Sequence, residues 1–493
     1  MTNEIDKNSD RPLYLQLKEV LTEQISKGQY GLGDSLPTES QLCEKYSVSR
    51  TTVRQAISEL TSDGYLERRR GSGTYVVKVP GKDIIELNLT VPDPIWEEPL
   101  DKAKDDYNSN LESSEREIKL NTEIIRRRRL RKELIGLIAR GSAPDIALID
   151  SVWLSEFADR HYIFPLDELS SNWIQEFSRD VYPVFIERNQ YNDSLYGIQI
   201  ESNVGGVWYR KDILNQEGLH PPETWQDLVN VSKHLKQPKV RKKYGLDEYP
   251  LAFCCGKKAG ETTTYQLLSL IYSSGGSFPF IKDKDVTKDK KSLTEALKFL
   301  KGLKFDHKVA YPEACSFKWN KPAKLFAQGQ VALSFGGSYE WDLIEDITGW
   351  TQEAFEKQVG FAPFPKGPGG RRTSTVGGMA YSIFQQSEEP ELALELLKKA
   401  SSKEIMAQFS RKHSRKPTRI SLTRDIDSKS EPFLYHTTKL FDFAALRPTI
   451  IEYSNISRVL QTVFERVYND EESIDEAVDR SENMISFLSD SSI

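Results

Sequence analysis

The stretch that decides the fold is Val48-Ser49-Arg50-Thr51-Thr52-Val53-Arg54-Gln55-Ala56, near the N-terminus of the chain. Apolar residues recur at helical spacing through and beyond it, in the set Val53, Ala56, Ile57 and Leu60. Ser49 occupies an N-cap position, and Gly64 stands just past the expected end. The stretch therefore predicts a short helix that begins after Ser49 and buries one apolar face.

The opposite face of this helix carries hydroxyl and guanidinium groups at its N-terminus: Ser49, Arg50, Thr51, Thr52 and Arg54. Backbone N–H groups and the helix dipole at such an end already favour phosphate. Arginine adds bidentate contacts to phosphate or to guanine edges. A solvated charged helix is the alternative for the arginines taken alone.

The flanking segments complete a DNA-binding motif. An apolar stripe predicts a first helix over Leu13–Ile25, and Thr38-Glu39-Ser40-Gln41 has the pattern of a capping box that opens a second. A turn at Ser47-Val48 leads to the third helix, which makes a helix-turn-helix. Tyr65–Arg70 and Thr74–Val77 then predict a hairpin, or wing, around a glycine-bearing turn.

Two segments in this order, RPLYLQLKEVLTEQI and LPTESQLCEKYSVSRTTVRQAISELTSDGYLERRRGSGTYVV, resemble the winged-helix domain of GntR-type transcriptional regulators. The resemblance covers residues 1–80 and implies binding to operator DNA. It implies DNA contacts from Ser49, Arg50, Thr51, Thr52 and Arg54, with Arg70 and Gly71 at the wing tip. Ser40 stands where many members of the family have arginine, which puts a backbone contact there in doubt.

Length and composition set the broader limits. A chain of 493 residues is too long for one hydrophobic core, so at least two domains are expected. The net charge of −6 does not by itself indicate nucleic-acid binding. We therefore expect the basic groups that bind DNA to be local to the recognition helix and wing. Four cysteines, Cys43, Cys254, Cys255 and Cys315, form no C-x-x-C pair and are expected to be reduced thiols. With no apolar leader and no run of 18 apolar residues, we expect a cytoplasmic protein.

Beyond the wing, strand and helix patterns alternate. Asp83–Thr90, Glu117–Leu120 and Asp145–Ile149 are expected strands, with helices expected between them over about 96–108 and from Leu130 to Gly141. This β-α-β-α-β order predicts an α/β domain with a mostly parallel sheet. Ligands bind beyond the carboxyl ends of such strands, where Asp150, Ser151 and Trp153 are placed.

Several later segments resemble the family-1, or maltose-binding-type, extracellular solute-binding proteins of sugar importers. They include GSAPDIALID, LYGIQIESNVGGVWYRKDILNQEGLHPPETWQDLVNVSKHL, LFAQGQVALSFGGSYEW, VGFAPFPKGPGG and VGGMAYSI. The resemblance implies a periplasmic-binding-protein type II fold over residues 83–493, with ligand between two α/β lobes. Lobe one would be about 83–200 and 366–430, and lobe two about 201–365 with C-terminal helices over 450–490. The chain would cross between the lobes near Ile200-Glu201-Ser202 and Pro363-Phe364-Pro365.

The resemblance also implies which residues contact the ligand. Tyr339 falls where this family presents a stacking aromatic ring, Trp341 is its alternate, and Tyr265 lies where relatives have a second ring. The full predicted set is Asp150, Trp153, Asn203, Tyr265, Gly337, Ser338, Tyr339, Trp341, Gly377 and Gly378. Core packing is the alternative for Tyr339 and Trp153, and the favoured interpretation for Trp208, Tyr209 and Trp225.

The run Arg126-Arg127-Arg128-Arg129 begins a predicted helix. Consecutive residues on a helix point in different directions, so a solvated helix start is favoured over one basic patch. The alternative is a contact with DNA phosphate, a partner subunit or an anionic ligand.

No catalytic motif and no close Cys/His spacing for a metal occurs, so we expect neither an enzyme nor a cofactor. The hypothesis is a DNA-binding regulator whose sensor binds a sugar or oligosaccharide. GntR relatives act as homodimers, with recognition helices about 34–36 Å apart on DNA. The alternatives are a cytosolic binding protein for a non-sugar ligand such as an amino acid or polyamine, or a domain used only for dimerisation.

Overall fold

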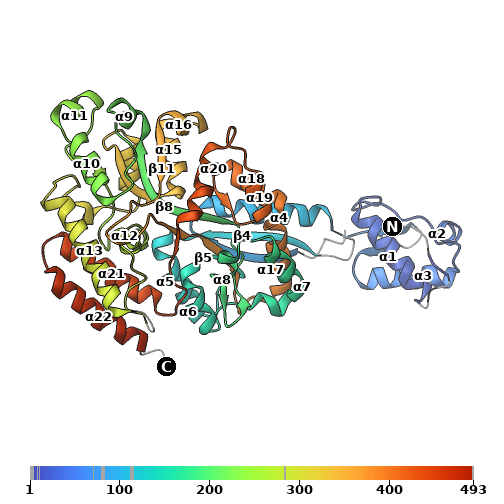
Figure 1. Ribbon diagram of the computed structural model, residues 1–493. Coiled ribbons are helices and arrows are strands. Elements are labelled where there is room, and N and C mark those ends of the chain that lie inside the picture. Colours follow the sequence, from blue (N-terminus) through green and yellow to red (C-terminus); the bar gives the residue numbers. More distant parts are fainter. Residues whose placement is uncertain are drawn as a thin grey trace. The chain divides into compact units, whose positions relative to one another are not determined.

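The computed structural model describes residues 5–7, 9, 11–69, 72–78, 84–111, 116–281 and 285–490 (Figure 1). The chain forms two compact units, Met1–Glu86 with Lys104–Leu120, and Leu87–Ala103 with Asn121–Ile493. The first unit thus takes in more of the chain than residues 1–80, because it includes part of the segment that follows the winged helix.

The first unit contains the predicted helix-turn-helix and wing. Its helices are α1 (Leu13–Ser26), α2 (Glu39–Tyr46) and α3 (Arg50–Ser62). They are followed by an antiparallel hairpin of β1 (Leu66–Arg69) and β2 (Gly73–Val76), in which Leu66 pairs with Val76. The predicted elements are confirmed, while Arg70 and Gly71 at the wing tip lie outside the described residues.

Local capping fixes where these helices begin. The Thr38 backbone N–H donates to Gln41 Oε1 at 2.8 Å, and the Thr38 hydroxyl accepts from the Gln41 N–H, which completes the predicted capping box. The Ser49 hydroxyl accepts from the Thr52 N–H at 3.1 Å. The apolar stripes predicted from the sequence meet in one core that includes Leu17, Leu21, Ile25, Leu42, Tyr46, Val53, Ala56, Ile57 and Leu60.

Two larger sheets follow the wing, and each forms the centre of one lobe. The first-lobe sheet has the strand order β13-β5-β3-β4. Its strands are β3 (Ile84–Val91), β4 (Glu117–Ile124), β5 (Ile146–Asp150) and β13 (Met379–Ile383). β3 and β5 are parallel, as the sequence predicts, whereas β13 returns from far along the chain and pairs antiparallel with β5.

Helices surround this sheet (Figure 1). They are α4 (Glu98–Ser109), α5 (Arg127–Ala139), α6 (Leu154–Asp159), α7 (Leu166–Arg179), α8 (Pro183–Glu187), α17 (Pro390–Ala400), α18 (Lys403–Lys412) and α19 (Ile420–Arg424). Short elements complete the lobe: the 3-10 helices η1 (Pro94–Trp96) and η2 (Ser151–Trp153), and a hairpin of β6 (Gln190–Tyr191) and β7 (Ser194–Leu195). All five residues of β5 are buried, and they include Asp150 at its carboxyl end.

The second-lobe sheet is organised around one long strand, β8 (Glu201–Arg210), which pairs with four others. The remaining strands are β9 (Leu251–Ala252), β10 (Leu333–Gly337), β11 (Val359–Ala362), β12 (Ser374–Gly377), β14 (Lys416–Pro417) and β15 (Ala444–Leu446). β10 and β11 pair with the second half of β8, and β12 and β14 with its first half.

The helices of this lobe are α9 (Lys211–Gln216), α10 (Trp225–Leu235), α11 (Pro238–Tyr244), α12 (Glu261–Ser273), α13 (Val286–Phe305), α14 (Lys321–Ala327), α15 (Trp341–Thr348), α16 (Gln352–Lys357) and α20 (Pro432–Lys439). Its 3-10 helices are η3 (Ala314–Ser316), η4 (Ser338–Glu340) and η5 (Leu440–Phe443). Two C-terminal helices, α21 (Tyr453–Tyr468) and α22 (Ile474–Asp490), contact α13, and α21 also contacts α12 and η2.

Two of the places where the chain passes between the sheets frame the candidate site; a later passage leads from β13 to β14 and β15. The first is the start of β8 at Glu201, where the sequence places it. The return crossing differs from the prediction at Pro363–Pro365: β12 still belongs to the second-lobe sheet, and the chain passes to β13 at Gly378. Gly378 has a φ of +155°, and a Cβ there would lie 2.1 Å from Gln199 Nε2, so this crossing requires glycine.

An aromatic cluster fills the second lobe and corrects one prediction. Trp341 is fully buried and stacks on Trp208 and Phe433 at 6.0 and 5.0 Å between ring centroids. Trp341 is therefore a core residue and not a ligand contact, because its ring has no exposed surface. Trp208 and Trp225 are buried, as the sequence favours.

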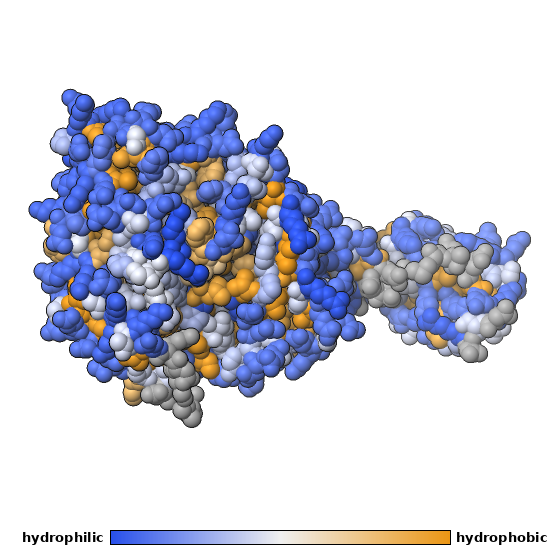
Figure 2. Space-filling view, in the orientation of Figure 1, coloured by the Kyte–Doolittle hydropathy of each residue, from blue (hydrophilic) through white to orange (hydrophobic). Residues whose placement is uncertain are grey.

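No helix among the described residues is both long and apolar enough to cross a membrane. On the face shown in Figure 2, hydrophilic residues predominate, with hydrophobic ones interspersed among them.

Candidate DNA-binding surface and ligand site

The start of α3 presents polar side chains to solvent. Ser49, Arg50, Thr51 and Arg54 are exposed, and Thr52 is half-buried. Val53 and Ala56 hold the opposite side of the helix in the core. The structure thus brings the five residues predicted from this helix to one accessible helix end, where unpaired N–H groups and guanidinium groups suit phosphate and base edges.

A carboxylate that the sequence analysis did not single out holds Arg54 in place. Glu39, in the first turn of α2, accepts from Arg54 Nε at 2.8 Å and lies 3.8 Å from Arg68 Nη2 on the wing. It therefore links α2, α3 and the hairpin. The capping box could have indicated this role of Glu39, because the box places Glu39 at the exposed N-terminus of α2.

Ser40, which stands where many members of the family have arginine, contacts Arg50 of the recognition helix. Its hydroxyl accepts a hydrogen bond from Arg50 Nη2 at 3.1 Å. Arg50 is thereby held beside the N-terminus of α2 while the rest of its fork stays exposed. An open groove of about 820 Å³ lies next to these residues, between the start of α2 and the wing. Its lining includes Pro37, Thr38, Glu39, Gln41, Arg68, Arg69 and Thr74.

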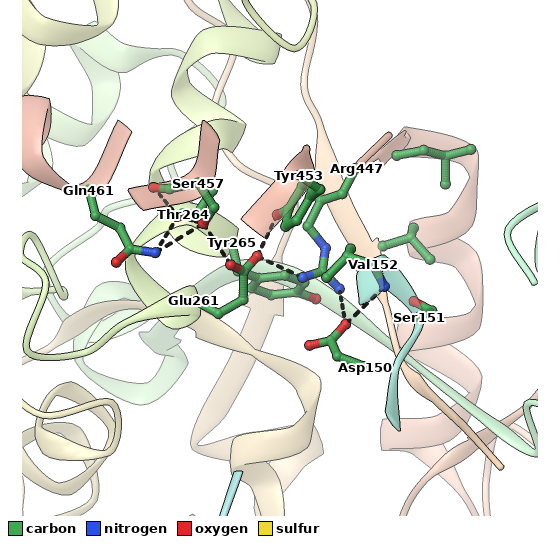
Figure 3. Close-up of polar contacts among 12 residues, drawn as sticks. Asp150, Ser151, Val152, Glu261, Thr264, Tyr265, Arg447, Tyr453, Ser457 and Gln461 are labelled. Carbon is green, nitrogen blue, oxygen red and sulfur yellow. Dashed lines mark hydrogen bonds and ion pairs between the residues drawn. The ribbon is translucent and has the colours of Figure 1, made fainter. Parts of the chain in front are cut away.

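The candidate ligand site lies in the second unit and centres on Asp150 (Figure 3). Asp150 is fully buried at the end of β5 and forms ion pairs with Arg127 Nη2 at 2.5 Å and Arg447 Nη2 at 3.3 Å. Asp150 Oδ1 also accepts from the Val152 N–H, which caps η2. Burial alone would raise the pKa of Asp150, but Arg447 and Arg127 outweigh it and hold that pKa below its ordinary value.

Arg447 joins the two lobes through this carboxylate. Its Nη1 donates to Glu261 Oε1, at the start of α12, at 2.8 Å, while Nη2 faces Asp150 of the first lobe (Figure 3). Glu261 in turn accepts hydrogen bonds from the hydroxyl groups of Tyr453 and Ser457 on α21. One buried guanidinium therefore connects β5, α12 and, through Glu261, the C-terminal helix.

Three predicted ligand residues gather beside this arginine. The Tyr265 hydroxyl donates to Asn203 Oδ1 at 2.8 Å, and the Arg447 guanidinium lies 5.4 Å from the Tyr265 ring centroid. A Cβ on Gly377 would come within 2.9 to 3.1 Å of Arg447, Asn203 and Tyr265. Gly377 thus lets these side chains converge, because it has no side chain of its own.

The loop after β10 supplies the remaining predicted aromatic ring. Tyr339 is half-buried, and its ring lies 6.0 Å from that of Tyr265 in an edge-to-face arrangement. Gly337 accommodates it, because a Cβ there would lie 2.2 Å from the Tyr339 ring. Ser338 accepts from the Val204 N–H at 3.1 Å, which ties the loop to β8.

A predicted tryptophan follows Asp150 in the chain. Trp153 ends η2, two residues from Ser151, and is half-buried.

Sequence reasoning missed Arg188, Glu261 and Arg447, and it favoured solvent for Arg127. Arg188 is buried and donates from Nη1 to the Val376 carbonyl and from Nη2 to the Ser151 hydroxyl, each at 3.0 Å. These residues lie far apart in the chain and in no motif, so their spacing carries no signal. Within the described ranges no group of His, Cys, Asp and Glu side chains could hold a metal ion.

The chain matches two known protein families. Residues 96–407 match the family described as bacterial extracellular solute-binding protein. The chain belongs to this family. Residues 13–76 match the bacterial regulatory proteins of the gntR family, so a GntR winged helix is fused to the solute-binding domain.

One curated relative and two solved structures illustrate the two parts. The chain is 51% identical over 72 residues to the uncharacterized HTH-type transcriptional regulator YurK of Bacillus subtilis, which is 15% of this chain and 30% of that protein. The chain therefore spans less than a third of that regulator. A solute-binding protein from Thermotoga lettingae, solved with alpha-D-tagatose, has a TM-score of 0.69 at 21% identity and covers 82% of this chain and 99% of its own. The maltose-bound MalE3 of T. maritima has a TM-score of 0.68 at 22% identity, over 82% and 100%.

Proposed function

We propose that this protein is a cytoplasmic transcriptional regulator that binds operator DNA through residues 1–80 and a sugar or oligosaccharide through residues 83–493. The observation that carries the proposal is the fusion itself. A GntR winged helix with exposed arginines at the start of α3 precedes a two-lobe solute-binding fold in the same chain.

The DNA contacts in this proposal come from Ser49, Arg50, Thr51, Thr52 and Arg54. Arg70 and Gly71 are assigned by their place in the GntR pattern. The exposure of Arg50 and Arg54 supports the assignment, as does their loose tethering to Ser40 and Glu39, which phosphate oxygens can replace.

The ligand in this proposal lies between the lobes, near Asp150, Asn203, Tyr265, Tyr339 and Gly377. Similar structures were solved with alpha-D-tagatose and with maltose, which supports a carbohydrate. Tyrosine rings offer flat faces to the C–H surface of a sugar, and Asn203 offers a polar group for its hydroxyls.

Ligand binding would shift the two lobes between open and closed arrangements, and this change would alter the spacing of two winged helices in a homodimer. The coupling is reciprocal, so operator DNA must change sugar affinity by the same factor. Equal sugar affinity for free and DNA-bound protein would contradict this mechanism.

The direct test replaces Arg50 by alanine and measures operator binding by fluorescence anisotropy. A lost base contact should weaken binding by about 1–3 kcal/mol without changing the melting temperature. Lys27→Ala, at an exposed cation just after the end of α1 that pairs only with Glu23 among the described residues, is the matched control. Unchanged operator binding by Arg50→Ala would reject Arg50 as a DNA contact, and a lack of operator binding by the unmodified protein would leave a solute-binding protein without a DNA function.

The effector can be found by a thermal-shift screen of sugars, oligosaccharides, amino acids and polyamines. A ligand at 100 times its dissociation constant should stabilise the protein by about 2.7 kcal/mol. A hit confined to amino acids or polyamines would preserve the regulator and reject the sugar.

A further inference from the structure

The basic run at residues 126–129 has no part in the proposed function. In the structure its arginines have different partners. Arg129 pairs with Glu133 on the exposed side of α5. In the same helix, Arg131 forms a bidentate ion pair with Glu156. Arg127 is the member that reaches the ligand site, through Asp150.

Cationic side chains outnumber anionic ones around Asp150, the partner of Arg127. Arg127, Arg188 and Arg447 surround Asp150 and Glu261, which gives three guanidinium groups and two carboxylates. The two acceptors of Arg188 are a carbonyl and a hydroxyl, both neutral. Its Nε is buried with no hydrogen-bond partner among the described residues. Burial and then the charge of Arg447 lower the pKa of Arg188 to about 10, so it stays charged at neutral pH.

Neighbouring acids do not remove this excess. Burial raises the pKa of Glu201 to about 7 and that of Glu340 to about 8, so much of their population is neutral near pH 7. Asp342 and Arg415 form their own ion pair at 2.6 Å and cancel. The surrounding tyrosines, Tyr265, Tyr339 and Tyr453, have raised pKa values and remain uncharged.

The excess charge is accessible at Arg127. The Arg127 side chain is 45% exposed, whereas Arg447 is 1% exposed. The bond to Asp150 uses one nitrogen of the Arg127 fork, and a guanidinium has five N–H donors. Arg127 is also the first residue of α5, a 13-residue helix whose N-terminal N–H groups and dipole add to the attraction for an anion.

We propose that this site takes an anionic carbohydrate, a sugar carrying a phosphate or a carboxylate group, and that Arg127 contacts that group. The sugar ring packs near Tyr339 and Tyr265, whose rings lie on the opposite lobe from Arg127. The anion then balances the positive charge that Asp150 and Glu261 leave uncompensated, and it does so only when both lobes are brought together around it. The inference rests on the proposed sensor function and names the class of effector.

The test is isothermal titration calorimetry on the full chain with matched sugars at constant ionic strength. The sets are glucose, glucose 6-phosphate and glucuronate; galactose and galacturonate; and N-acetylglucosamine with its 6-phosphate. We expect a charged member of at least one set to bind at least tenfold more tightly than its neutral partner. Preference for the phosphates or for the uronates identifies which anion the site takes.

The variants locate the effect. Arg127→Gln should reduce the charged-to-neutral preference toward one, and Arg127→Lys, which keeps the charge, should retain part of it. Arg129→Gln, two residues along the same helix and paired only with Glu133 among the described residues, should leave the preference intact.

Three results would overturn the inference: neutral sugars that bind as tightly as their charged partners, no binding by any charged member, or a preference that Arg127→Gln leaves unchanged. The first leaves the proposed function standing, because a neutral sugar could still shift operator affinity. Failure of the proposed function is seen separately, as operator binding that no bound sugar alters.

Discussion

The winged helix and the candidate ligand site both use arginines held by carboxylates, but in opposite settings. At the winged helix, Arg54 and Glu39 are 62% and 30% exposed and come from neighbouring helices. At the ligand site, Arg447 and Asp150 are 1% and 0% exposed and lie 297 residues apart in the chain. An exposed pair contributes little to stability and separates easily, whereas a buried pair is expensive to break.

This difference in burial suits the two tasks of the proposed function, DNA binding and ligand sensing. A DNA-binding surface needs guanidinium groups that can leave their partners for phosphate, so weak, hydrated tethers suit it. A sensor needs an element whose rearrangement couples distant parts of the fold, and a buried cation shared by β5 and α12 meets that need.

The largest expected effect is that of Arg447→Ala. It leaves buried Asp150 and half-buried Glu261 without this cation and beside a cavity, and breaking a buried ion pair in this way costs about 3–5 kcal/mol. Denaturant unfolding of the sensor should report this loss. Arg458→Ala, an exposed arginine on α21, should change stability by less than about 0.5 kcal/mol. A loss below 1 kcal/mol for Arg447→Ala would mean that the network contributes little to holding the lobes.

A second buried carboxyl predicts a pH dependence. Glu340 accepts from Trp208 Nε1 at 3.0 Å and from the Gly337 N–H at 3.2 Å, and burial raises its pKa from 4.5 to about 8. Between these two values the folded protein binds more protons than the unfolded chain, so stability falls as pH rises. The fall from this group approaches about 1.4 kcal/mol per pH unit.

Glu340→Gln is neutral at every pH and should flatten the stability profile between pH 5 and 8, as measured by denaturant melts at each pH. The flattening is partial, because burial also raises the pKa of Glu201 and Glu345 to about 7. Glu391→Gln, at an exposed site on α17, is the control. A profile identical to that of the unmodified protein would show that Glu340 is ionised in the fold.

At the winged helix, Ser49→Ala should have a moderate effect. It removes the acceptor for the Thr52 N–H and should destabilise the first unit by about 0.5–2 kcal/mol. Ser58→Ala, exposed in the middle of α3, tests for a general effect of losing a hydroxyl. Equal losses from both variants would remove the capping explanation.

The smallest expected change is that of Glu39→Gln, which breaks the tether to Arg54 and Arg68. Because the pair is exposed, stability should change by less than about 1 kcal/mol. Set beside Arg447→Ala in the same unfolding assay, this variant tests the contrast between the two regions directly. Similar losses from the two would abolish it.

The sequence anticipated the winged helix well because its signals are local. The capping box at Thr38, the N-cap at Ser49 and the stripe through Val53 each act within one or two turns of helix. Its signals were less complete at the candidate ligand site. Asp150, Asn203, Tyr265 and Gly377 do converge, but Trp341, only two residues beyond Tyr339, lies in the aromatic core. The start of α15 turns its ring inward, and no local pattern distinguishes that direction.

The sequence by itself determined the GntR helix-turn-helix, the solute-binding fold and the absence of recognisable catalytic motifs, because periodicity, caps and motif order are written along the chain. Only the tertiary structure decided which charges meet. Arg127, Arg188, Glu261 and Arg447 come from four segments without a shared motif. The chain passes between the two sheets at Glu201, at Gly378 and again before Arg447 to bring them around Asp150. The balance of charge at the site is therefore a property of the fold, since electrostatic energy depends on distance and burial and not on position in the sequence.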